Sequence, residues 1–73
     1  MQLQAGRRIA ILVNGERTET GAAFLGELLS QLGFEQDQVA TALNGAFVPK
    51  QARDATPLAA DDKVEIVAPR QGG

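Results

Sequence analysis

Two Asn-Gly dipeptides, each placed directly after a short apolar stretch, constrain the fold of this chain more than any other feature. Residues 9–13 alternate apolar side chains at the two-residue period of a strand with one buried face, and Asn14-Gly15 follows them. Residues 39–43 precede Asn44-Gly45 in the same way. Because Asn-Gly tolerates positive φ at both central positions of a tight turn, the pattern predicts two hairpins. Their return strands should cover residues 16–19 and 46–48.

Between the hairpins, leucines recur at the spacing of one helix face. They are Leu25, Leu28, Leu29 and Leu32. This stripe predicts a helix over residues 23–32 that ends at Gly33. The nearest N-cap candidate is Thr20, and Gly26 inside the helix costs about 1 kcal/mol relative to alanine.

The C-terminal third of the chain predicts one more strand. Residues 63–68 alternate again, with Val64 and Ile66 on one face, after a turn at Asp61-Asp62. Residues 50–58 show no period, and we expect a loop with at most one tight helical turn. The order of elements predicts an α+β domain in which a mixed sheet of four to five strands packs on one main helix, the β-grasp arrangement of ubiquitin-like domains.

Composition excludes several classes of function. At 73 residues the chain should form a single domain over residues 1–73. It contains no Cys, His, Trp or Tyr, so we expect no metal site, no bound cofactor and no catalytic residues of its own. A net charge of −2 argues against nucleic acid as a partner. No apolar run reaches the length of a membrane span or a secretory signal, and we expect a cytoplasmic protein.

The chain ends in Gly72-Gly73. Two residues without Cβ would give residues 69–73 the form of a thin, flexible functional tail, able to enter a narrow tunnel and present the terminal carboxylate. The alternative is a plain glycine end without a role. Adjacent Asp61-Asp62 lacks further ligands, and we interpret the pair as turn formers.

Several segments in order resemble the ThiS family, the sulfur carrier proteins of thiamin biosynthesis. The resemblance is carried by residues 11–16, 27–29, 32–33, 39–45, 48–50, 64–67 and 71–73. The chain departs from the family pattern at two places. Gln51-Ala52-Arg53 follows the Val-Pro-Lys step where relatives often carry an aromatic residue, and Asp61-Asp62 stands where they tend to have Gly-Asp.

This resemblance implies a carrier that is a substrate of enzymes and is not itself one. An adenylating enzyme of the ubiquitin-activating type would use ATP to adenylate the Gly73 carboxylate, and a sulfur donor protein would convert it to a thiocarboxylate. Thiazole synthase would accept the sulfur. Open alternatives are the small subunit of molybdopterin synthase, a ubiquitin-like protein modifier, and a β-grasp module that binds partners non-covalently.

Partner docking would need an apolar patch near the tail, because a sheet with one helix leaves its second face uncovered. If Val64 and Ile66 face the helix, Val67 faces away, and Leu12 and Phe47 could join it. The alternative is that these three fill core gaps or lie singly on the surface. Arg70, next to the tail, either pairs with an acidic cleft on the partner or is solvated.

Overall fold

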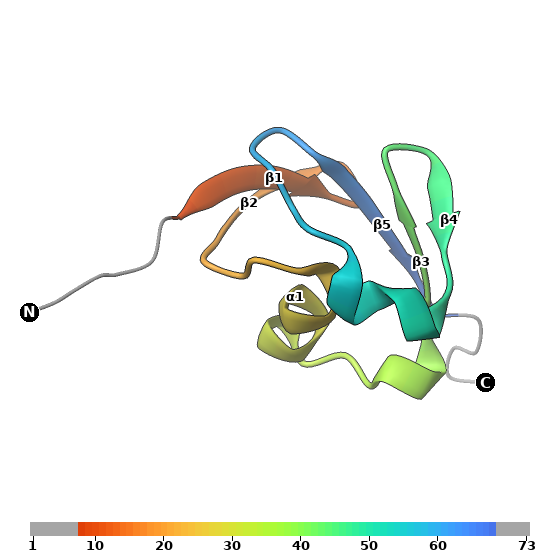
Figure 1. Ribbon diagram of the computed structural model, residues 1–73. Coiled ribbons are helices and arrows are strands. Elements are labelled where there is room, and N and C mark those ends of the chain that lie inside the picture. Colours follow the sequence, from red (N-terminus) through yellow and green to blue (C-terminus); the bar gives the residue numbers. More distant parts are fainter. Residues whose placement is uncertain (1–7, 69–73) are drawn as a thin grey trace, which may run out of the picture.

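The computed structural model describes residues 8–68 (Figure 1). Two N-terminal strands, β1 (Ile9–Val13) and β2 (Glu16–Thr20), precede the main helix α1 (Leu25–Leu32). The short 3₁₀ helix η1 (Gln36–Gln38) leads into strands β3 (Ala40–Leu43) and β4 (Ala46–Val48). A second 3₁₀ helix, η2 (Lys50–Ala55), and the last strand, β5 (Lys63–Val67), complete the fold.

The strands form one mixed sheet in the order β2-β1-β5-β3-β4. The two hairpins are antiparallel, whereas β5 runs parallel to β1 and antiparallel to β3. The last strand is therefore the central one, between the two hairpins. Helix α1 and both 3₁₀ helices lie on the same side of the sheet, and no element of residues 8–68 covers the other side (Figure 1).

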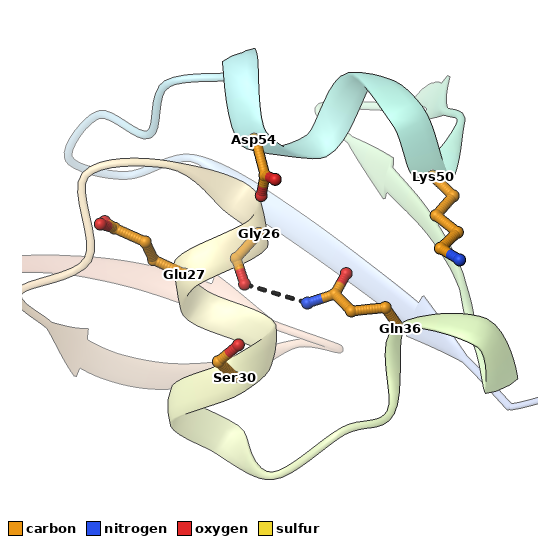
Figure 2. Close-up of a pocket in the computed structure, with 6 residues that line it drawn as sticks. All are labelled: Gly26, Glu27, Ser30, Gln36, Lys50 and Asp54. Carbon is orange, nitrogen blue, oxygen red and sulfur yellow. Dashed lines mark hydrogen bonds between the residues drawn. The ribbon is translucent and has the colours of Figure 1, made fainter.

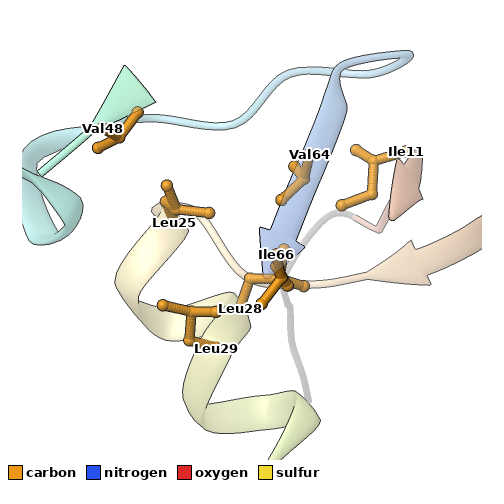
Figure 3. Packing of buried hydrophobic residues seen from close by; sticks show 7 residues of the cluster. All are labelled: Ile11, Leu25, Leu28, Leu29, Val48, Val64 and Ile66. Carbon is orange, nitrogen blue, oxygen red and sulfur yellow. The ribbon is translucent and has the colours of Figure 1, made fainter. Parts of the chain in front are cut away.

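The core lies between this helical layer and the inner face of the sheet (Figure 3). Its buried apolar side chains are Ile11, Leu25, Leu28, Leu29, Val48, Val64 and Ile66. Along β5, Val64 and Ile66 are buried and their neighbours are exposed, so the predicted alternation is confirmed. Burial of three of the four leucines in the stripe, with Leu32 packed at the edge of the core, likewise confirms the predicted helix face.

Both predicted hairpin turns are confirmed by their backbone angles. Asn14 and Asn44 have φ values of 53° and 52°, and Gly15 and Gly45 have φ values of 84° and 87°. Positive φ at both central positions is the conformation that Asn-Gly was expected to supply. The helix also ends as predicted, at Gly33, with φ of 86°.

The predicted start of the helix is wrong. Helix α1 begins at Leu25 with Phe24 as its N-cap, and Oε1 of Glu27 accepts the N–H groups of Ala23 and Phe24 at 2.7 and 3.3 Å. Thr20 is fully buried at the end of β2, where its hydroxyl bonds to Gln31 instead. Chain geometry decides this outcome, because β2 continues through Thr20 and residues 21–24 are needed to reach the helix.

Residues 50–55 form a longer helical segment than the single turn expected for them. The reason is Arg53, whose side chain is 2% exposed and anchors η2 to the chain entering β3. The other predicted strand boundaries agree with the structure to within one residue. In the described part of the chain, no helix is long and apolar enough to cross a membrane.

Candidate functional site

The predicted reactive residues, Gly72 and Gly73, and their neighbour Arg70 lie outside the described residues. What the structure does show is the strand that precedes them. Strand β5 is held between β1 and β3 in the middle of the sheet, and the described chain ends one residue after it. The contacts at the end of β5 therefore decide where the tail begins.

Asn14 makes the contact that fixes this end of β5. The N–H of Ile66 donates to Oδ1 of Asn14 at 2.8 Å, and Nδ2 of Asn14 donates to the carbonyl oxygen of Ile66 at 3.0 Å. From the sequence, Asn14 was expected only to form the turn. Its second role carries no local signal, because the partner lies 52 positions away.

Asn44 holds the opposite end of β5 in a similar way. Its Oδ1 accepts the N–H of Lys63 at 2.9 Å, and its Nδ2 donates to the carboxylate of Asp62 at 3.0 Å. The other carboxylate oxygen of Asp62 accepts the N–H of Ala59 at 2.8 Å. Asp62 thus works as a turn former, as expected. Residues 8–68 contain no cluster of acidic side chains arranged to hold a metal ion.

The uncovered face of the sheet carries an exposed apolar patch. Phe47 and Val67 are 70% and 58% exposed. They border a shallow hollow of about 200 Å³, whose floor includes Ala40 and Ala42 and whose one charged lining residue is Glu65. Strand register explains the grouping, since Ala42 pairs with both Phe47 and Glu65, and Ala40 pairs with Val67. We call this feature the outer-face hollow.

Leu12 lies on the same face but away from the outer-face hollow. It is half-buried, and in the sheet it pairs with Arg17 on one side and Lys63 on the other. The structure therefore brings Phe47 and Val67 together and leaves Leu12 among charged neighbours. The expectation that Val67 faces away from the helix is confirmed.

A second hollow, of about 310 Å³, lies on the helical side between α1 and η2 (Figure 2). Its lining residues are mostly of polar or charged types, namely Gly26, Glu27, Ser30, Gln36, Lys50 and Asp54. Gln36 spans it with a 3.2 Å bond to the carbonyl oxygen of Gly26. Within residues 8–68 the Ser30 hydroxyl makes no hydrogen bond to either carboxylate that lines this hollow, Glu27 or Asp54. The side chains that line this second hollow therefore include no nucleophile paired with a base.

One ion pair lies beside this second hollow. Nζ of Lys50 pairs with Oδ1 of Asp37, and both side chains are largely exposed. The hydrogen bond from Lys50, followed by its charge, lowers the pKa of the Asp37 carboxyl. The pair links η1 to the start of η2 on the surface. It adds no chemistry to the hollow itself.

The fold and the exposed face together define a class of protein. A five-stranded mixed sheet that packs on one main helix, with the C-terminal strand at its centre, is the β-grasp fold of ubiquitin-like proteins, as predicted. The sequence model of the ThiS family matches residues 11–73. The chain belongs to the ThiS family, the family of sulfur carriers that its motifs resemble.

Two solved structures support this assignment. The crystal structure of a thiamine biosynthesis protein (ThiS) from Geobacter metallireducens is 35% identical, with a TM-score of 0.76, and the match covers 89% of this chain and all of that one. A solution structure of a thiamine biosynthesis protein from the same organism is 33% identical, with a TM-score of 0.70, over 89% of this chain and 87% of that one. No curated protein matches the chain.

Proposed function

We propose that this protein carries sulfur for thiamin biosynthesis as a thiocarboxylate on Gly73. The observation that carries the proposal is the family match, which continues through Gly72 to Gly73 in a chain that has no Cys or His. Without a thiol, the chain has no side chain that could hold sulfur as a persulfide. The terminal carboxylate is the group that remains.

The chemistry requires activation by a partner enzyme. A carboxylate accepts a sulfur nucleophile only after one of its oxygens has become a good leaving group. The Gly73 carboxylate would attack the α-phosphate of ATP on an adenylating enzyme and release pyrophosphate. Sulfide would then attack the acyl carbon and release AMP, which leaves a terminal thiocarboxylate. Where a donor protein supplies the sulfur as a persulfide, the attack would give an acyl disulfide and AMP, and a thiol would cleave this disulfide to the thiocarboxylate and a new disulfide. In this scheme the chain is a substrate and does not catalyse either step.

The outer-face hollow supports the docking part of the proposal. Phe47 and Val67 present exposed apolar area beside small residues, which suits insertion of an apolar side chain from the activating enzyme or from thiazole synthase. Leu12 and Arg70 remain predicted docking residues, the first at the margin of this face and the second outside the described residues. A cytoplasmic location also remains a prediction from the sequence.

Intact-mass spectrometry tests the proposal directly. The protein is incubated with ATP, sulfide and an adenylating enzyme of the ubiquitin-activating type. We expect the mass to increase by the difference between one sulfur and one oxygen atom, and we expect no change in a variant that lacks Gly72 and Gly73. An unchanged mass of the full chain, or an equal shift in the truncated variant, would contradict the proposal.

The same experiment identifies the acceptor. Purified thiazole synthase, added with its own substrates as sulfur acceptors, should return the thiocarboxylate form of the carrier to its original mass, whereas the large subunit of molybdopterin synthase with its substrate should leave the mass unchanged. The opposite result would assign the chain to the molybdopterin alternative. A conjugate with a lysine of another protein would instead indicate a ubiquitin-like modifier.

A further inference from the structure

We infer that the Asn14 side chain is a positioning residue for the C-terminal tail, because it completes the pairing of β5 where β1 has already turned away. The inference rests on the proposed function, since it concerns how the Gly73 carboxylate is presented to the activating enzyme. The Asn14 residue of this Asn-Gly turn would then both reverse the chain and hold β5.

The hydrogen bonds between β1 and β5 show how the side chain takes over from the backbone. The N–H of Leu12 donates to the carbonyl oxygen of Asp62 at 2.9 Å, and the N–H of Asn14 donates to that of Val64 at 2.8 Å. In a parallel ladder the next bonds would join Ile66 to the following peptide groups of β1. At Asn14, however, φ is 53° and the backbone leaves the sheet.

The amide of Asn14 supplies both of those missing bonds. Its Oδ1 accepts the N–H of Ile66, and its Nδ2 donates to the carbonyl oxygen of the same residue. Ile66 is 5% exposed, so an unpaired peptide group there would carry a desolvation cost. The amide therefore extends the parallel pairing beyond the end of β1.

Ile66 lies next to the last residue of β5, close to the point where the tail begins. On the other side of β5, β3 pairs with Ile66 and Val67 through Thr41 and Ala40. Asn14 adds a second side, so the end of β5 is held from both directions. Because β5 ends one residue before residues 69–73 begin, contacts that hold Ile66 and Val67 fix the point from which the tail leaves the sheet.

Turn geometry alone does not require this amide, and the chain provides a matched control. Glycine adopts positive φ without steric strain, so Asn14→Gly preserves the turn geometry and removes the amide, at an entropic cost that Asn44→Gly shares. Asn44→Gly does the same at the other hairpin, where the lost bonds are to Asp62 and Lys63 at the start of β5. Each variant loses two side-chain hydrogen bonds, at opposite ends of the same strand, and those of Asn44 are the more exposed.

Steady-state adenylation of the full-length carrier distinguishes a positioning role from a purely structural one. We expect kcat for Asn14→Gly to fall about tenfold relative to Asn44→Gly, with KM nearly unchanged because the outer-face hollow is intact. A general loss of stability would instead raise the apparent KM of both variants, since part of the carrier would be unfolded. Hydrogen exchange should show faster exchange of the Ile66 amide in Asn14→Gly than in Asn44→Gly.

Equal kcat values for the two variants, with a wild-type chain that is adenylated normally, would overturn the inference and leave the proposed function standing. Slow exchange at Ile66 in Asn14→Gly would overturn it as well, because the strand end would then be fixed by other contacts. A wild-type chain that is never adenylated would overturn the proposed function, and the positioning role with it.

Discussion

Nε of Arg53 donates a 3.1 Å hydrogen bond to Oγ1 of Thr41, and both residues are 2% exposed. The rest of the guanidinium donates to the carbonyl oxygens of Gln36 and Val39 at 2.8 and 2.7 Å. The one ion pair in the described part of the chain does not involve Arg53. A buried cation is thus held by neutral oxygens, which ties η2 to the segment that enters β3.

Arg53→Lys should therefore destabilise the protein by about 2–3 kcal/mol. A guanidinium donates in one plane to the carbonyl oxygens of Gln36 and Val39 and to the hydroxyl of Thr41. A lysine ammonium cannot reach all three acceptors in that arrangement. Urea unfolding measures the loss of stability. Arg17→Lys, at an exposed position of β2, is the control and should change stability little. Equal stability of the two variants would mean that the hydrogen bonds of Arg53 contribute nothing net.

Gly26→Ala tests why a glycine lies inside α1. A Cβ there would overlap Oδ1 of Asp54 on η2, so the carboxylate would have to move. Asp54 is exposed and Oδ1 is the far end of its flexible side chain, so the cost of moving it should roughly cancel the helix preference for alanine, and we expect little net change in the wild-type background. In an Asp54→Ala background the same substitution should stabilise by about 1 kcal/mol, the ordinary helix preference for alanine. Identical effects in the two backgrounds, measured by thermal unfolding, would rule out this explanation.

The two adjacent aspartates should respond in opposite directions to glycine. Asp61 has φ of 72°, a conformation that favours glycine, and Asp61→Gly should stabilise the protein by up to about 1 kcal/mol. Asp62→Gly should destabilise by about 1–2 kcal/mol, because its carboxylate bonds to Ala59 and Asn44 are lost. Chemical denaturation of both variants checks the pair, and a shared sign would be inconsistent with the structure.

Phe47→Ser should weaken binding to the activating enzyme without unfolding the carrier. The ring is 70% exposed, so its removal takes little from the core, whereas a central aromatic contact in an interface is often worth tenfold or more in affinity. Isothermal titration with the activating enzyme measures this effect. Gln51→Ser, at an exposed position of η2, serves as the control; comparable affinity of both variants would place the docking surface elsewhere.

Lys50→Ala should raise the pKa of Asp37 towards its ordinary value, because the hydrogen bond and charge of Lys50 lower it. A carboxyl whose folded pKa is depressed contributes stability above its unfolded pKa, and that contribution is lost as pH falls through the folded pKa. The pair is exposed, so the change in stability should be small. An NMR titration of Asp37 that is the same in both proteins would contradict the pairing.

Much of the fold follows from local pattern. The alternation along β5 and the leucine stripe of α1 predict which side chains are buried, because strand and helix periods fix side-chain direction over a few residues. The Asn-Gly turns are equally local. The start of the helix was mispredicted because Thr20 is a residue type that often caps helices but here is the last residue of β2. Thr20 is buried there, and its hydroxyl bonds to Gln31 of α1.

Sequence alone determined the strands, the turns and the helix face, and the lack of Cys and His led us to propose the Gly73 carboxylate as the reactive group. Only the tertiary structure decided that Arg53 is buried and that the amide of Asn14 pairs with Ile66. It also decided that Asp54 of η2 lies where a Cβ of residue 26 would be. The physical reason is separation along the chain. These contacts join residues between 12 and 52 positions apart along the chain, a separation that no local period encodes.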